Sequence, residues 1–138
     1  MELQADHVGI TVTELDRAVE FYRGVLDLPV LDRFTVSGAA FAEAVGIANA
    51  TGRFAHLDAG GARIELVEYD PEGESLTPGD VNQPGAKHLG FAVDDLDAFF
   101  DTLPATVEAL SEPQTTESGT RIYFFRDPEG NLIEVLER

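Results

Sequence analysis

The sequence contains no cysteine and no tryptophan, and its 138 residues include one methionine and one lysine, Lys87. The absence of cysteine excludes disulfides, thiolate metal ligands and a cysteine nucleophile. No stretch approaches the roughly 20 apolar residues of a membrane-spanning helix. The first residues lack the basic and apolar segments of a secretory signal. We therefore expect a cytoplasmic protein that does not enter a membrane.

Basic residues are also scarce, since 9 Lys and Arg stand against 26 Asp and Glu, giving a net charge of −17. A field of this sign repels phosphate backbones and anionic membranes, so we expect no nucleic-acid partner. The acidic residues are spread along the whole chain rather than gathered in a tail. This pattern is typical of a halophilic protein, whose self-repulsion is screened at high ionic strength. An acidic protein from a low-salt environment is the alternative.

The chain contains an internal repeat. Residues 7–16 and 88–97 share His, Gly, Val, Leu and Asp at matching positions. Residues 64–68 and 133–137 share Ile and both Glu at matching positions, with Leu and Val in exchanged order between them. Internal repeats indicate repeated structural units. Each half therefore carries one His in an early strand and one Glu in a late strand.

Hydrophobic periodicity predicts the same order of elements in both halves, strand-helix-strand-strand-strand. The first module has strands at 5–12, 28–36, 53–58 and 62–69, a helix capped by Thr13 with Asp16 three residues on, and a short helix or lid at 39–47. The second has strands at 86–93, near 105–112, 119–126 and 131–137, and a helix at 95–103.

The predicted fold is α+β. Modules 1–70 and 86–138 are joined by the Pro- and Gly-rich loop 71–85 into a single domain, 1–138. Two βαβββ modules are expected to form an open, barrel-like mixed sheet around a groove. The apolar face of each sheet, which includes Val8, is expected to be covered by the helices.

Four polar residues of these strands form a candidate metal site. His7 and His88 alternate with apolar residues, and Glu65 and Glu134 lie within apolar runs where an unpaired carboxylate is costly. Alone, each is more often structural, but the repeat places both residue types twice. Two imidazoles and two carboxylates suit a divalent cation such as Zn, Ni, Co, Mn or Fe(II).

A third histidine, His56, also lies near this candidate site. The Gly60-Gly61 turn places His56 opposite Glu65 on the same face of a hairpin. His56 would then orient Glu65 or contact a substrate, and a packed or exposed structural histidine is an equal alternative.

Several segments carry a family resemblance: residues 7–12, 18–28, the strand beginning at His88, and the run from Asp127 to Glu134. In these the chain resembles the vicinal oxygen chelate superfamily, which includes glyoxalase I, methylmalonyl-CoA epimerase, extradiol dioxygenases and fosfomycin- and bleomycin-resistance proteins. The resemblance implies metal ligands on the first and fourth strands of each module. Those ligands are His7, Glu65, His88 and Glu134.

This ligand set resembles that of glyoxalase I. The epimerase usually has Gln at the position of Glu65, and the dioxygenases use only the two His and the last Glu. A fourth protein ligand takes a position that dioxygen would need. We therefore expect a metal-dependent lyase or isomerase of glyoxalase I type, acting on a hemithioacetal or 2-carbonyl thioester.

The resemblance implies Glu134 as the catalytic base, leaving the metal transiently. Glu43 is a second candidate for the base because the epimerase has an additional Glu in that region. The alternative is that Glu43 lies on a solvated helix face.

The alternative functions are a methylmalonyl-CoA-epimerase-like isomerase, a small-molecule binding or resistance protein, and an Fe(II) extradiol dioxygenase. The resemblance also implies a homodimer, with the site inside one chain or shared. Cations available for a thiol conjugate, not matched to a family pattern, are Arg17, Arg53, Arg63, Arg121 and Arg126.

Overall fold

The computed structural model describes residues 1–76 and 79–138. Thr77 and Pro78 of the expected 71–85 loop lie outside the described residues. The chain divides into two compact units, Met1–Ser75 (unit 1) and Leu76–Arg138 (unit 2), and each is described by itself. Within the described ranges, no helix has the length and apolar character needed to cross a membrane.

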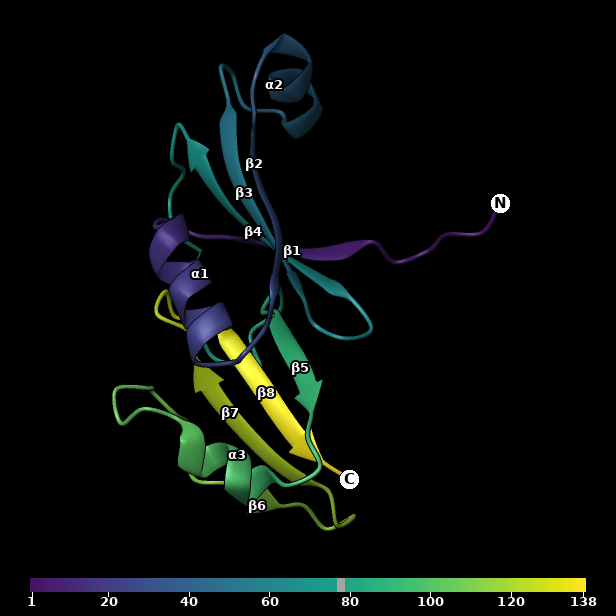
Figure 1. Cartoon of the computed structure of the whole chain (residues 1–138), viewed down its shortest axis with the longest axis vertical. Coiled ribbons are helices and arrows are strands. Elements are labelled where there is room, and N and C mark those ends of the chain that lie inside the picture. Colours follow the sequence, from purple (N-terminus) through teal and green to yellow (C-terminus); the bar gives the residue numbers. More distant parts are fainter. Residues whose placement is uncertain (77–78) are drawn as a thin grey trace. The chain divides into compact units, whose positions relative to one another are not determined.

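Unit 1 is a four-stranded mixed sheet with two helices (Figure 1). Its strand order is β1-β4-β3-β2, with β1 parallel to β4 and the other pairs antiparallel. The elements are β1 (His7–Thr11), α1 (Leu15–Gly24), β2 (Val30–Val36), α2 (Ala39–Val45), β3 (Thr51–Asp58) and β4 (Arg63–Asp70).

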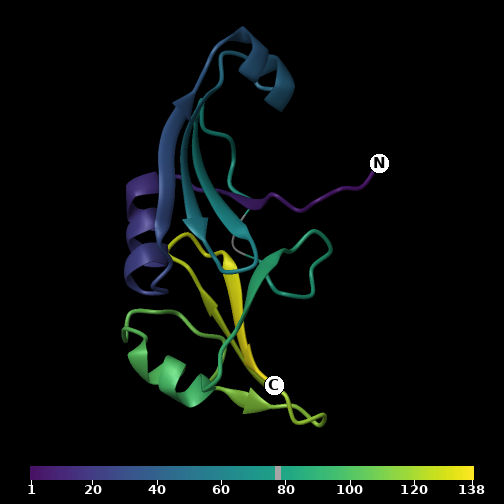
Figure 2. The ribbon, with the colours of Figure 1, turned by 45° about the vertical axis from the view of Figure 1, so that its right-hand side comes forward.

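Unit 2 repeats this scheme with the order β5-β8-β7-β6, and again the His-bearing strand is parallel to the Glu-bearing strand. Figure 2 shows α3 running alongside this sheet. The elements are β5 (His88–Ala92), α3 (Leu96–Thr102), β6 (Gln114–Thr115), β7 (Arg121–Arg126) and β8 (Leu132–Glu137). The predicted α+β class with two βαβββ modules is confirmed, and neither sheet closes on itself within the described residues.

The strand predicted near 105–112 is wrong. The strand that pairs with β7 in its place is β6, which is two residues long and begins after Pro113. Residues 108–110 contact β7 through isolated hydrogen bonds, from Arg126 N–H to the Glu108 carbonyl and from Leu110 N–H to the Phe124 carbonyl. Because Pro104 and Pro113 have no N–H to donate, they limit regular pairing along this edge.

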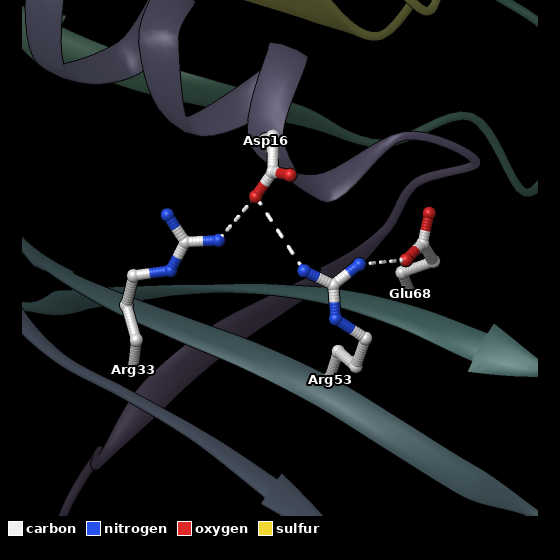
Figure 3. Close-up of polar contacts among 4 residues, drawn as sticks. All are labelled: Asp16, Arg33, Arg53 and Glu68. Carbon is white, nitrogen blue, oxygen red and sulfur yellow. Dashed lines mark hydrogen bonds and ion pairs between the residues drawn. The ribbon is translucent and has the colours of Figure 1, made fainter.

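The expected capping box of the first helix is also wrong. Glu14, rather than Thr13, occupies the N-cap of α1, and the Glu14 side chain makes no capping hydrogen bond. Asp16 instead interacts with Arg33 of β2 and with Arg53 of β3, whose guanidinium also pairs with Glu68 at 2.6 Å (Figure 3). This network links α1 to three strands of its sheet.

The core of unit 1 lies between α1 and the central strands. The helix buries its apolar stripe, in which Tyr22 is fully buried, and contacts β3 and β4. Val8 on the edge strand β1 is therefore 49% exposed, so the expected cover over β1 is incomplete. The buried residues of α1 are Leu15, Ala18, Val19, Phe21 and Tyr22.

The β7–β8 turn forms where the sequence predicted it. Asp127 accepts hydrogen bonds from the N–H of Glu129 and of Asn131, each at 2.9 Å, and Gly130 has φ 89°. A side chain that satisfies two backbone donors fixes the turn. The turn sets the register that pairs Phe124 with Glu134.

Candidate metal centre

The repeat produces a His–Glu pair in unit 1. Because β1 runs parallel to β4, Gly9 lies beside Glu65, and His7 Nε2 comes within 3.5 Å of Glu65 Oε2. A Cβ added at Gly9 would lie 3.8 Å from Glu65 Oε1, so glycine leaves that side of the carboxylate uncovered. The predicted residues His7 and Glu65 are thus adjacent in the structure.

Unit 2 contains the equivalent pair. Gly90 lies beside Glu134, and His88 Nε2 is 3.5 Å from Glu134 Oε1. A Cβ at Gly90 would again lie 3.8 Å from the carboxylate. The exposed fractions also match, since the side chains of His7 and His88 are 38% and 39% exposed. Each half therefore places its imidazole and carboxylate at the same separation and with the same histidine exposure.

The separation within each pair fits two ligands of one ion. At 3.5 Å the nitrogen and oxygen are too far apart for a strong hydrogen bond. Ligand atoms bound to one ion at about 2.0–2.2 Å lie roughly 3.0–3.5 Å from each other at the usual coordination angles. Among the described residues, no group of three or more His, Cys, Asp or Glu is close enough to hold an ion by itself. Each unit accordingly supplies a pair of donors, of the type that Zn, Ni, Co or Mn binds.

Asp6 orients His7 and was missed in the sequence. His7 Nδ1 lies 2.7 Å from Asp6 Oδ2, a hydrogen bond that raises the pKa of His7 and lowers the pKa of Asp6. The proton on Nδ1 leaves Nε2 as the lone-pair nitrogen, and Nε2 is the atom that lies towards Glu65. Carboxylates commonly fix metal-binding histidines in this way.

His56 lies directly beside Glu65, as the turn predicted. Its Nε2 is 2.7 Å from Glu65 Oε2, and the two side chains are only 14% and 15% exposed. The ring meets Phe34 edge-on at 5.1 Å and stacks with His7 at 5.8 Å. The Glu65 carboxylate therefore has an imidazole on each of two neighbouring strands.

An aromatic cluster, which we call the aromatic wall, continues the same face of the unit 1 sheet. Phe34 stacks on Phe54 at 5.0 Å, and Phe41 of α2 stacks on Tyr69 at 6.3 Å. Burial, and secondarily the negative charge of Glu65, raise the pKa of Tyr69. The phenol therefore stays neutral near pH 7. The aromatic wall consists of Phe34, Phe41, Phe54 and Tyr69.

Glu43 lies apart from these contacts. It is an exposed residue of α2, two positions after Phe41 and hence on the other side of the helix from the aromatic wall. Its catalytic role stays a prediction.

Four of the five arginines considered for a thiol conjugate have partners of their own. Arg17 pairs with Glu14, Arg121 pairs with Asp97, and Arg126 donates to the carbonyls of Gly130 and Gly79. Arg53 belongs to the network of Figure 3. A thiol conjugate that used these cations would compete with the carboxylates and carbonyls already bound to them.

Known proteins resemble this chain over most of its length. The family model of the glyoxalase/bleomycin resistance protein/dioxygenase superfamily matches residues 4–135, and the chain belongs to this superfamily. A relative named 2-epi-5-epi-valiolone epimerase, from Actinomyces sp., is 31% identical, covering 94% of this chain and 76% of the relative.

Solved structures show the same fold. A glyoxalase family protein from Bacillus cereus is 27% identical with a TM-score of 0.88, covering 99% of this chain and 95% of the other. A lactoylglutathione lyase from Agrobacterium tumefaciens has a TM-score of 0.65 at 20% identity, covering 97% and 92%, and supports the fold alone.

Proposed function

We propose that this protein is a metal-dependent lyase or isomerase that moves a proton at the carbon next to a carbonyl group. The observation that carries the proposal is the pair of repeated His–Glu contacts, each with nitrogen and oxygen 3.5 Å apart. The proposed ligands are His7, Glu65, His88 and Glu134, within one chain or shared across a dimer. A bound divalent ion would polarise the substrate carbonyl and so acidify the neighbouring C–H bond.

The residues of the chain supply the proton transfer. Glu134 is the proposed base, because its carboxylate sits on the rigid strand β8 and is only 18% exposed. A carboxylate held within reach of the reacting C–H can act as a general base. Glu43 is the second candidate, and it would have to reach the substrate from α2.

The proposed substrate class follows from the removal of a proton next to a carbonyl group. A hemithioacetal or 2-carbonyl thioester presents a carbonyl next to an acidic C–H, as glyoxalase-type chemistry requires. The name of the 31% identical relative is that of an epimerase, 2-epi-5-epi-valiolone epimerase, and epimerisation next to a carbonyl uses the same proton removal followed by return to the other face. Proton exchange next to a carbonyl is thus common to the leading function and to its epimerase alternative.

The test is exchange of substrate hydrogen in D₂O, followed by proton NMR. The metal-loaded protein is incubated with the methylglyoxal–glutathione hemithioacetal, methylmalonyl-CoA or 2-epi-5-epi-valiolone. We expect deuterium at the carbon next to the carbonyl of at least one substrate, lost on chelation and reduced at least about 100-fold in Glu134→Gln. Glu43→Gln distinguishes the second candidate base.

Other outcomes would refute the proposal. Oxygen uptake with a catechol would indicate a dioxygenase, and small-molecule binding that is unchanged by chelation would indicate a binding protein. Metal content of protein purified without chelators provides the companion measurement. We expect about one Zn, Ni, Co or Mn per site, and less in His88→Ala.

The proposal extends to the setting in which the protein works. We propose a halophilic, cytoplasmic homodimer that takes a small-molecule substrate. Light scattering at high and low salt tests the dimer, and a monomer at all salt concentrations would contradict it.

A further inference from the structure

We propose that His56 is a positioning residue that holds the Glu65 carboxylate in place as a fixed metal ligand, whereas the described part of the chain provides no such partner for Glu134 at the equivalent position. This inference rests on the proposed function, since it takes both carboxylates as ligands. It goes further, because it assigns His56 the role of fixing one of the two repeated carboxylates.

The two distances at Glu65 distinguish the two imidazoles that face it. His56 Nε2 lies 2.7 Å from Oε2, a charge-assisted hydrogen-bond length, whereas His7 Nε2 lies 3.5 Å from the same oxygen. Two ligands of one ion are seldom closer than about 3.0 Å when the bond lengths are about 2.1 Å. His56 therefore donates its Nε2–H to Glu65 rather than joining it as a ligand.

His56 is itself held firmly. It pairs with Glu65 in the β3–β4 ladder, and the edge-on contact with Phe34 limits rotation of its ring. At 14% exposure, the hydrogen bond forms largely away from water, where such bonds are strongest. Glu65 Oε1 is left on the side of Gly9. One oxygen of Glu65 is thus fixed by His56, and the rotation of the carboxylate is set with it.

Unit 2 lacks this partner at the equivalent position. The residue paired with Glu134 in the β7–β8 ladder is Phe124, whose ring contacts His88 edge-on at 5.2 Å. A phenyl ring has no N–H to donate to a carboxylate. Among the described residues, the repeat therefore keeps both His–Glu pairs but places a hydrogen-bond donor at the facing ladder position of Glu65 and not of Glu134.

The experiment compares two substitutions of His56 in the full chain. His56→Phe copies the arrangement around Glu134, and His56→Gln keeps an N–H donor at a similar reach. Co(II) is titrated into apoprotein, and binding is followed by the visible absorption of the bound ion. We expect His56→Phe to lower Co(II) affinity by about 10–100-fold, as loss of a residue that orients a ligand does, with a changed absorption band. His56→Gln should restore most of the affinity and the band.

The outcomes separate the inference from the proposed function. If the wild-type chain binds Co(II) and His56→Phe binds it equally well with the same spectrum, the inference is wrong and the metal site stands. If the wild-type chain binds no Co(II), the proposed function fails, and the inference fails with it. Thermal unfolding of the apoproteins checks that the variants are folded. If His56→Phe does not fold, His56→Met, of similar size and without a donor, provides the same comparison against His56→Gln.

Discussion

Gly52 is the position where one methyl group should disturb the aromatic wall most. It lies in β3, paired with Tyr69. A Cβ built there would lie 2.6 Å from Phe54 Cε1 and 3.2 Å from Phe41 Cζ. Ordinary carbon contacts are about 3.5–4.0 Å, so the Phe54 ring would have to shift by about 1 Å. That ring is 6% exposed and stacked on Phe34, and it has little room to do so.

The expected cost of Gly52→Ala follows from two opposing effects. Overpacking a well-filled site costs about 1–3 kcal/mol, while replacing glycine lowers the entropy of the unfolded chain and returns about 0.4–1 kcal/mol. We expect a net loss of about 1–2 kcal/mol in the free energy of unfolding. For a chain of 138 residues this lowers Tm by roughly 3–7 °C.

Gly61→Ala provides the matched control, since it lies in the β3–β4 turn, has no positive φ, and its added Cβ would meet nothing within 4 Å. Urea unfolding and thermal melting of both variants, in the same salt, measure the difference. If Gly52→Ala is as stable as Gly61→Ala, the aromatic wall is looser than its contacts indicate and the reasoning is wrong.

Three further predictions concern charge. Arg33 and Arg53 lower the pKa of Asp16 below its ordinary 3.8, so its contribution to stability is present above that pH and is lost as pH falls through the folded pKa. Asp16→Asn should therefore be less stable at pH 7 and lose less on acidification, and parallel acid-unfolding curves would contradict this. Asp6→Asn, which removes the carboxylate that orients His7, should lower Co(II) affinity about 10-fold, whereas unchanged affinity would show that Asp6 does not orient the ligand. With a net charge of −17, Tm should rise between 0.1 and about 2 M KCl as repulsion is screened, and a salt-independent Tm would contradict the halophilic interpretation.

The repeat in the sequence predicted that each half supplies one His and one Glu of a common site, and the structure brings the His and Glu of each unit together. Once the first and fourth strands of each module are parallel neighbours, residues at matching offsets meet, which explains why His7 meets Glu65 and His88 meets Glu134. The register of His56 against Glu65 was equally predictable, because a two-residue turn fixes every pair in its hairpin.

Features that depend on side-chain rotamers, or on elements far apart in the chain, could not be predicted from the sequence. The Asp6–His7 hydrogen bond joins neighbours in the chain, and only the side-chain torsions decide whether it forms. The aromatic wall collects residues from β2, α2, β3 and β4, whose spacing shows no period. The sequence placed this strand at 105–112, because apolar residues recur through that segment. The strand found is the short β6, which lies beyond it, and the prolines at both ends of 105–112 limit regular pairing there.

The pairing of His56 with Glu65 and of Phe124 with Glu134 has an evolutionary meaning. A duplicated module begins with two identical sites, so any change that improves one carboxylate as a ligand would, in a symmetric assembly of single modules, alter the other as well. Fusion of both modules into one chain removes this constraint. Here the residues that make the His–Glu contacts are the same in both halves while the neighbouring position has diverged. Such a chain can change the surroundings of one carboxylate while those of the other stay as they were.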